Sequence, residues 1–306
     1  MQLLSRRKFL LNSAVTLGGA AILPNDLGFF KKHREIVGLQ LYSVRDDMKA
    51  NPMDTLKQLS QMGYKYVEHA NYVNRKFYGW SASEFKKILD DLGMKMKSGH
   101  TVMGKDHFDA TKKDFTDVWK HTVEDAATAG QKYVISPWLD ASLRKTQDDL
   151  KRYMEVFNKS GELCKKSGMK FGYHNHHFEF AEKLDGVPVF DIILNNTDPS
   201  LVAQQLDIGN MYNGGALAQD ILKRFPGRFE LMHVKDEVEA KVVHNNEKYE
   251  SSILGVGIIG TKEVMDMGRK IGNTSNFIIE QESYQGKKPL DSMKEDLAIM
   301  KSWGYV

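Results

Sequence analysis

The segment 172–180, GYHNHHFEF, gathers three of the ten histidines of the chain within four positions. Neutral imidazoles bind transition metals and exchange protons near neutral pH. Further along the chain, Asp207, His233, Lys235 and Glu280 stand at the ends of short apolar runs. Histidine nitrogens and carboxylate oxygens together suit Mn²⁺, Fe²⁺, Co²⁺ or Zn²⁺ better than Ca²⁺ or Mg²⁺. These residue types therefore point to one divalent metal ion with acid or base groups beside it.

Residues this far apart need a scaffold that brings their segments together, and the chain from about residue 35 has a repeating pattern. Short β-branched or aromatic runs alternate with amphipathic stretches such as 51–63 and 81–93, which open with a capping residue and end at a glycine. Eight strand–helix pairs over about 270 residues predict an α/β fold, a (β/α)8 TIM barrel. The alternative is a doubly wound open sheet, although no GxGxxG motif follows the first strand.

In a (β/α)8 barrel the active site lies at the carboxyl ends of the strands. The expected strand ends carry titratable side chains: Glu68, His100, His174 to His177, Asp207, His233, Lys235, Glu280 and Glu282. Alternate residues of a strand face the same side, so His174 and His176 share one face. The pattern leaves open which of these two histidines binds the metal.

Several of these segments resemble the xylose isomerase-like barrel superfamily, in its sugar isomerase and epimerase branch. The resemblance covers about 36–303 and is carried by GLQLYSVRDD, GYKYVEHA, GYHNHHFEF, QLDIGN, LMHVKD and FIIEQE. In that family Glu, Asp, His and Glu on strands five to eight hold a divalent metal. The resemblance implies Asp207, His233 and Glu280 as ligands, with His174 in the place of the first glutamate.

The resemblance further implies a divalent-metal-dependent sugar isomerase or epimerase that moves a proton next to a sugar carbonyl. The expected catalytic residues are Glu280, Lys235 and His176. The expected substrate-binding residues are Tyr42, Glu68, His100 and Trp138. A histidine in place of the strand-five glutamate resembles inosose dehydratase-like members, so the alternative is a lyase or dehydratase that acts by elimination on a keto sugar or keto glycoside. A non-catalytic sugar-binding protein is a third hypothesis.

The N-terminal segment has the layout of an export signal. Arg6 and Arg7 precede a short apolar run, 9–23, which resembles the twin-arginine type of signal peptide. We therefore expect residues 1–30 to be a signal peptide and short linker, 31–306 to be the barrel domain, and the mature protein to be periplasmic or otherwise exported. The run is short for a membrane span, so stable membrane insertion after cleavage is not expected.

Charge and cysteine content exclude some classes of binding partner and of covalent structure. The net charge of +3 disappears if Arg6, Arg7 and Lys8 leave with the signal, which gives no electrostatic case for nucleic acid, and hence none for an endonuclease on the same fold. The single cysteine, Cys164, excludes an intramolecular disulfide framework. We expect a small-molecule sugar as substrate, and the sequence leaves a homo-oligomer open. The polar segment 237–257 is a candidate lid over the site.

Overall fold

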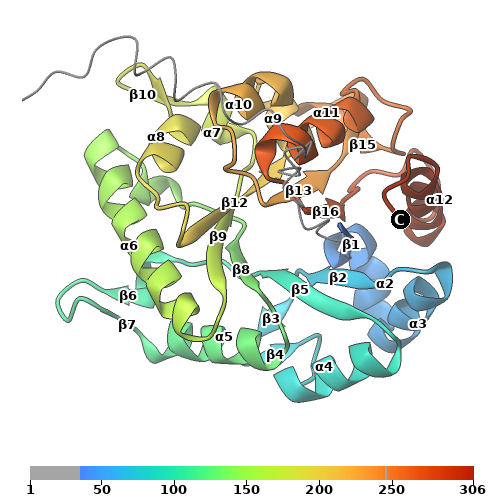
Figure 1. Ribbon diagram of the computed structural model, residues 1–306, viewed down its shortest axis with the longest axis horizontal. Helices are drawn as coiled ribbons and strands as arrows, with labels where there is room; N and C mark the ends of the chain where they lie inside the picture. Colours follow the sequence, from blue (N-terminus) through green and yellow to red (C-terminus); the bar gives the residue numbers. More distant parts are fainter. Residues whose placement is uncertain (1–34, 245–246) are drawn as a thin grey trace, which may run out of the picture. The chain divides into compact units, whose positions relative to one another are not determined.

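The computed structural model describes residues 35–244 and 247–306, and the signal peptide predicted for 1–30 lies outside them. Eight parallel strands close into a barrel in the order β1-β16-β13-β12-β9-β8-β5-β2 (Figure 1). The strands are β1 (Ile36–Gln40), β2 (Tyr66–His69), β5 (Lys95–His100), β8 (Tyr133–Ser136), β9 (Lys170–His174), β12 (Val202–Asp207), β13 (Leu231–Val234) and β16 (Asn276–Ile279). The closed barrel confirms the predicted (β/α)8 fold and excludes the open sheet.

Helices surround the barrel and connect successive strands (Figure 1). They are α2 (Arg45–Ala50), α3 (Pro52–Met62), α4 (Ala82–Asp91), α5 (Asp117–Thr128), α6 (Gln147–Lys166), α7 (Phe178–Ala181), α8 (Val189–Asn195), α9 (Ile208–Asn213), α10 (Ala218–Arg224), α11 (Thr261–Met267) and α12 (Pro289–Ser302). Asn51 caps α3 and Ser81 caps α4 as the sequence predicts, the latter through a capping box with Glu84. α5 begins only at Asp117, because the residues before it form a short hairpin.

Four antiparallel hairpins extend from the barrel. They are β3 (Tyr72–Val73) with β4 (Lys76–Phe77), β6 (Phe108–Asp109) with β7 (Asp114–Phe115), β10 (Lys183–Leu184) with β11 (Val187–Pro188), and β14 (Asp236–His244) with β15 (Glu247–Ser252). The last hairpin occupies the segment in which we expected a lid. Its two polar strands form a ladder with each other, so this segment has a regular structure of its own.

Alternation along the strands divides the apolar core from the barrel interior. Phe171 and Tyr173 of β9 point outward and pack on Phe157 of α6, with ring centroids 4.9 and 5.5 Å apart. Gly172 and His174 therefore point inward. A Cβ at Gly172 would lie 2.4 Å from Cδ1 of Ile135, so the interior below His174 is filled by neighbouring strands.

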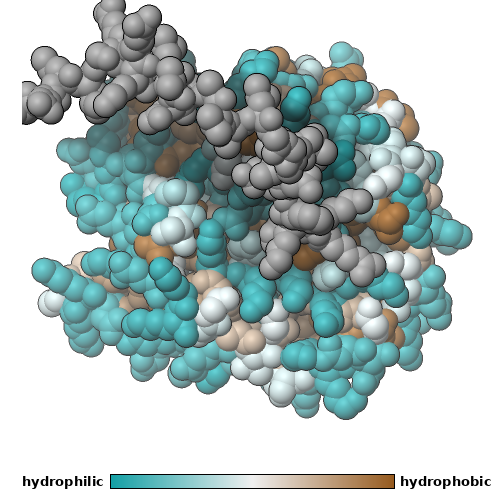
Figure 2. All heavy atoms as spheres, in the orientation of Figure 1, coloured by the Kyte–Doolittle hydropathy of each residue, from teal (hydrophilic) through white to brown (hydrophobic). Residues whose placement is uncertain are grey.

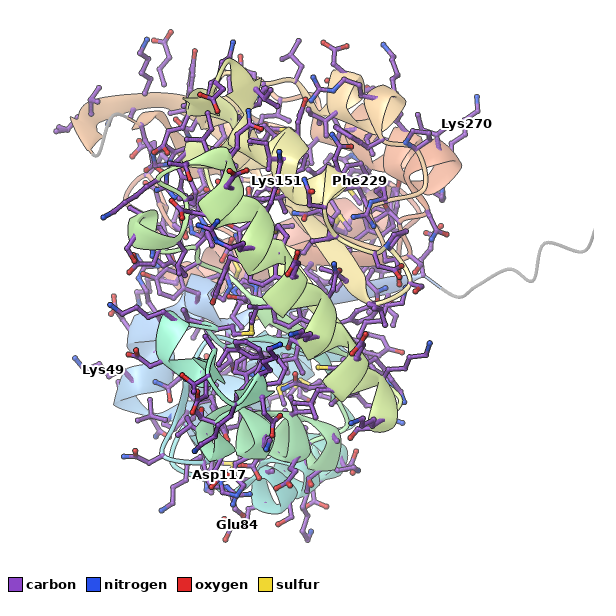
Figure 3. All side chains as sticks on the ribbon, turned by 90° about the vertical axis from the view of Figure 1, so that its left-hand side faces the viewer. Lys49, Glu84, Asp117, Lys151, Phe229 and Lys270 are labelled. Carbon is purple, nitrogen blue, oxygen red and sulfur yellow. The ribbon has the colours of Figure 1, made fainter. Side chains whose placement is uncertain are left out.

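The outer surface of the helices is polar. Figure 3 shows the side chains of Lys49, Glu84, Asp117 and Lys270 projecting away from the barrel, whereas Phe229 is buried beneath the helices. The face shown in Figure 2 is mostly hydrophilic, with apolar residues scattered across it. Within 35–244 and 247–306, none of the helices combines the length and the apolar character that crossing a membrane requires.

Candidate functional site

Four side chains from neighbouring strands meet inside the barrel mouth. His174, Asp207 and His233 lie in β9, β12 and β13, and Glu280 directly follows β16. Each offers one ligand atom, and these atoms all lie within 4.8 Å of one another. All four residues are buried. The four predicted metal ligands are therefore one group in space, which we call the ligand group.

The donor chemistry of the ligand group fits a divalent cation. It combines two imidazoles with two carboxylates, and Oδ2 of Asp207 is buried without a hydrogen-bond partner. Nζ of Lys235 lies 3.1 Å from this oxygen and 2.9 Å from Oε2 of Glu280, so the lysine ammonium stabilises the negative charge of both carboxylates. Such a group could hold one metal ion of the Mn, Fe, Co or Zn type.

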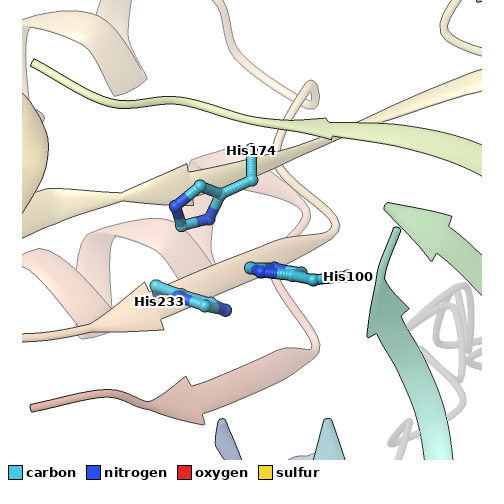
Figure 4. A group of neighbouring side chains, drawn as sticks. All are labelled: His100, His174 and His233. Carbon is cyan, nitrogen blue, oxygen red and sulfur yellow. The ribbon is translucent and has the colours of Figure 1, made fainter. Parts of the chain in front are cut away.

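A second set of three histidines overlaps the ligand group. His100, His174 and His233 point toward one another from three strands (Figure 4). Their ring centroids lie 4.5 to 5.1 Å apart, and the rings of His100 and His233 are stacked. The sequence pattern predicted His100 as a substrate contact and missed its place beside the two histidine ligands.

Glu68 lies beneath these histidines and accepts hydrogen bonds on both carboxylate oxygens. Oε1 accepts from Nε2 of His233 at 2.6 Å and from Nε2 of Gln40 at 2.8 Å, and Nε2 of His100 lies 3.0 Å away. Oε2 accepts from Nε2 of Gln205 at 2.8 Å. Glu68 is fully buried and does not line the cavity, which corrects its predicted role in substrate binding.

This network defines which nitrogen of each histidine ligand carries a proton. Because the amide nitrogen of Gln205 donates to Glu68, its oxygen is free to accept from Nδ1 of His174 at 3.0 Å and Nε2 of His100 at 2.7 Å. The other nitrogen of His174, Nε2, then faces Asp207 at 3.6 Å. In His233, Nε2 faces Glu68, and Nδ1 faces Glu280 at 2.9 Å. Nε2 of His174 and Nδ1 of His233 are thus the candidate donor atoms.

Charge in the ligand group is strongly coupled. Burial opposes a charged His233, but the carboxylates of Glu280 and Glu68 outweigh burial and raise its pKa to about 10. Burial would raise the pKa of Glu280, but Lys235 and His233 hold that pKa well below its ordinary value. Burial and the neighbouring imidazoles lower the pKa of His174, which keeps it neutral. An anionic carboxylate and a neutral imidazole are the forms that bind metal ions, so a metal ion would have to displace one proton from His233 before Nδ1 could act as a donor.

A cavity of about 810 Å³ opens above the ligand group. Of the predicted substrate-binding residues, Tyr42, His100 and Trp138 line it. Of the predicted catalytic residues, Glu280 and His176 line it. Glu282, Asn210 and the segment 70–75 contribute further to its wall.

One predicted catalytic residue, Lys235, has an altered assignment. Lys235 is buried and does not line the cavity, and although burial lowers its pKa, the surrounding carboxylates raise that pKa well above its ordinary value. A lysine in this state is a weak acid, so its geometry supports orientation of Asp207 and Glu280 rather than donation of a proton to substrate. Alternation from His174 predicts that His177 faces the helix layer. Instead, its Nδ1 lies 3.1 Å from Oε1 of Glu247 in β15.

Glu282 is a carboxylate to which the sequence analysis gave no role. It lines the cavity, its side chain is 44% exposed, and its Oε2 lies 3.5 Å from Nζ of Lys235. It stands two residues after Glu280 in FIIEQES, and its place among the titratable strand ends was the signal in the sequence that could have identified it. Because it lies outside the ligand group, Glu282 is free to exchange a proton with a molecule in the cavity.

Comparison with known proteins agrees with this fold. The model of the family "xylose isomerase-like TIM barrel" matches residues 56–303. Inosose dehydratase from Clostridium perfringens is 30% identical over 107 residues, which are 35% of this chain and 35% of that enzyme, so the chain spans about a third of the length of the curated relatives that it matches.

Two solved structures share the fold over most of the chain. One is a sugar phosphate isomerase/epimerase from Parabacteroides distasonis, with 23% identity and a TM-score of 0.76, covering 93% of this chain and 100% of that chain. The other is the IOLI protein with a binding zinc atom, with 14% identity and a TM-score of 0.68, covering 89% of this chain and 98% of that chain. With a (β/α)8 barrel and a family match over most of its length, the chain belongs to the xylose isomerase-like TIM barrel family.

Proposed function

We propose that the protein is a divalent-metal-dependent sugar isomerase or epimerase that moves a proton at the carbon next to a sugar carbonyl. The observation that carries the proposal is the ligand group at the floor of a cavity, with the accessible carboxylate of Glu282 beside it. A divalent ion held by His174, Asp207, His233 and Glu280 would supply polarisation of the carbonyl oxygen.

Two side chains that line the cavity lie outside the ligand group and can act on a substrate. Glu282 follows β16 and His176 follows β9, so they come from the two ends of the strand run β16-β13-β12-β9 that carries the ligand group. Burial lowers the pKa of His176 to about 3, so its imidazole is neutral, and its buried Nδ1 has no hydrogen-bond partner. Glu282 is therefore the proposed proton acceptor, and the neutral imidazole of His176 is proposed to hydrogen-bond a hydroxyl of the substrate.

Lys235 would hold Glu282 at a fixed position relative to the ligand group. Its ammonium contacts Glu280 and Asp207 in the ligand group, and also Glu282. It thus holds the proposed base at a fixed position relative to the ligands, which is what proton transfer at one carbon requires. Tyr42 and Trp138, whose rings border the cavity, offer apolar surface to the face of a sugar ring.

A dehydratase or lyase is the second candidate. The residue that supports it is His174, which occupies the ligand position where the family resemblance implies a glutamate. Two carboxylates, Glu280 and Glu282, line the cavity, and Glu280 belongs to the ligand group. Glu282 is then left to act as a base, and one base is sufficient for elimination. The partial match to inosose dehydratase supports the same reading.

The discriminating experiment uses keto sugars in deuterated water with protein of measured metal content. Proton NMR should show deuterium at the carbon next to the carbonyl if the enzyme is an isomerase or epimerase, with no loss of mass from the sugar. Loss of water or of an aglycone would assign the lyase alternative. Absence of both exchange and elimination across a panel of aldoses, ketoses and keto glycosides would contradict an enzymatic function at this site.

The leader pattern at Arg6 and Arg7 supports a further element of the proposal, that the protein is exported in folded form. A metal site assembled before export would select its ion inside the cell.

A further inference from the structure

The outer wall of the cavity differs in chemistry from its floor. The floor presents imidazoles and carboxylates of the barrel strands, among them His174, Glu280 and Glu282. The outer wall is built by the β3–β4 hairpin, the loop after β5 and the first turns of α5. Its aliphatic members are Val73, Val102 and Val118. We call these three valines the valine wall.

The valines of the valine wall line the cavity and are exposed to solvent. Val73, Val102 and Val118 are 57%, 44% and 62% exposed, which is high for apolar side chains. Tyr42 and Trp138, also large, apolar and exposed, line the same cavity. Apolar side chains that gather around a concave site and remain exposed mark a ligand-binding surface.

The hairpin that carries Val73 is held in place from the helix layer. Asp125 of α5 accepts hydrogen bonds from the hydroxyl of Tyr72 at 2.6 Å and from Nε and Nη2 of Arg75 at 2.9 and 2.7 Å. These bonds hold the turn, in which Asn74 and Arg75 have φ values of 50° and 62°. The wall is therefore formed before a ligand arrives, which lowers the entropy cost of binding.

Three polar side chains near the valine wall form hydrogen bonds within the protein. Besides the bonds of Arg75 to Asp125, the hydroxyl of Thr122 donates to the carbonyl of Val118 at 2.9 Å. Nδ1 of His107 accepts from the backbone amide of Gly104 at 3.0 Å. An apolar ring would cover the valines without breaking any of these hydrogen bonds.

We propose that the valine wall binds the apolar, planar aglycone of a glycoside whose sugar ring lies over the ligand group. This inference rests on the proposed function, because that function places a sugar ring at the floor. A cavity of about 810 Å³ is large enough for both parts, as ligand cavities range from about 300 to 1,000 Å³. The substrate class is thus a glycoside with an aromatic aglycone rather than a free monosaccharide.

The test compares methyl and phenyl β-D-glucosides and β-D-galactosides by isothermal titration calorimetry. These glycosides lack a ketone, so binding is measured without turnover. The phenyl member of at least one pair should bind on the order of tenfold more tightly than the methyl member, the range expected for added apolar contact in a pocket. Val118→Asp should remove this difference and leave the methyl glycoside unchanged.

The variant and its control are chosen to preserve the fold. Val118 is the second residue of α5, where an acidic residue favours the helix, so Val118→Asp should fold. Val256 is 68% exposed and does not line the cavity, and Val256→Asp should leave both affinities unchanged.

Four outcomes would overturn the inference. Equal affinity for the two members of every pair would remove the aglycone site and leave the proposed function standing. Cellobiose or lactose binding as tightly as the matching phenyl glycoside would assign the wall to a second sugar ring. If Val118→Asp changes the oligomeric state in sedimentation but not the affinity ratio, the wall is a contact between copies. Absence of all glycoside binding together with absence of keto-sugar exchange would overturn the proposed function as well.

Discussion

Oε1 of Glu68 lies 2.6 Å from Nε2 of His233, and neither side chain is exposed to solvent. The carboxylate and the imidazole come from strands whose residues are 165 positions apart in the sequence. Through Gln205, the same carboxylate also determines the orientation of His174 and His100. One acidic residue that no ligand can touch therefore controls both histidine members of the ligand group.

Glu68→Gln should weaken metal binding although Glu68 is not in the ligand group. The new amide nitrogen would face the amide nitrogen of Gln205, so Gln205 would turn and withdraw its oxygen from Nδ1 of His174. We expect metal affinity to fall by about 10- to 100-fold, the usual effect of removing a partner of a histidine ligand. Competition with a chelator measures the affinity, and the visible spectrum of Co²⁺-loaded protein reports the ligand geometry.

The control is Glu155→Gln on the exposed side of α6, which should leave affinity and spectrum unchanged. A Glu68→Gln protein with the affinity and Co²⁺ spectrum of the wild type would show that the histidines are oriented without Glu68.

Glu280→Gln and Glu282→Gln should have separable effects. Because Glu280 belongs to the ligand group, its replacement should lower both metal content and turnover. Glu282 lies outside the ligand group, so Glu282→Gln should retain metal while turnover falls by at least about 10²-fold, the lower range for a general base. Metal analysis and keto-sugar exchange at saturating metal distinguish the two variants. Loss of metal in Glu282→Gln would make it a ligand, and full activity would remove it from the mechanism.

The stability of the fold should depend on pH through Asp296 in α12. Its Oδ1 accepts from the backbone amide of Leu254 at 2.9 Å, its buried Oδ2 has no partner, and burial raises its pKa to about 7. The folded state therefore takes up a proton between about pH 4 and 7 that the unfolded state does not, so stability falls as pH rises through this range.

Asp296→Asn should imitate the protonated form and remove this loss. Each pKa unit corresponds to about 1.4 kcal/mol, so the variant should be more stable than the wild type by a few kcal/mol at pH 8 and similar to it near pH 4. Urea unfolding at both values measures the difference. Asp185→Asn, at an exposed position, is the control. A variant that is no more stable than the wild type at pH 8 would mean that burial does not raise the pKa of Asp296 in the folded state.

Export should depend on the paired arginines of the leader, which precede the described residues. Replacing Arg6 and Arg7 with lysine should leave uncleaved precursor in the cytoplasm, because lysine keeps the charge but not the twin-arginine pattern. Fractionation and immunoblotting detect the precursor. Unchanged export would point to the general secretory route, and an unprocessed chain in the wild type would contradict the predicted signal peptide.

The sequence predicted the barrel because its signals are local. A glycine or capping residue bounds many helices, and each barrel strand is a short apolar run whose outward residues pack on helices, as Phe171 and Tyr173 do. Alternation along β9 also placed His174 inward. It could not separate His174 from His176, because β9 ends at His174 and strict alternation no longer applies beyond it.

Other features of the site depend on contacts between distant segments. The composition around Glu68 indicates a strand end, but its four partners come from four other strands, so only the closed barrel shows that its oxygens are occupied. The β14–β15 hairpin was expected as a lid loop because its polar strands pair with each other and leave no apolar periodicity to detect.

Asp125 lies in the helix layer and does not line the cavity, yet its carboxylate fixes the hairpin that bears Val73. Evolution can therefore alter which ligands this barrel admits without changing any residue that meets them, by substitutions in a helix behind the wall. Engineering for altered substrate range should accordingly randomise position 125 together with Tyr72 and Arg75, since hydrogen bonds among these three side chains fix the hairpin.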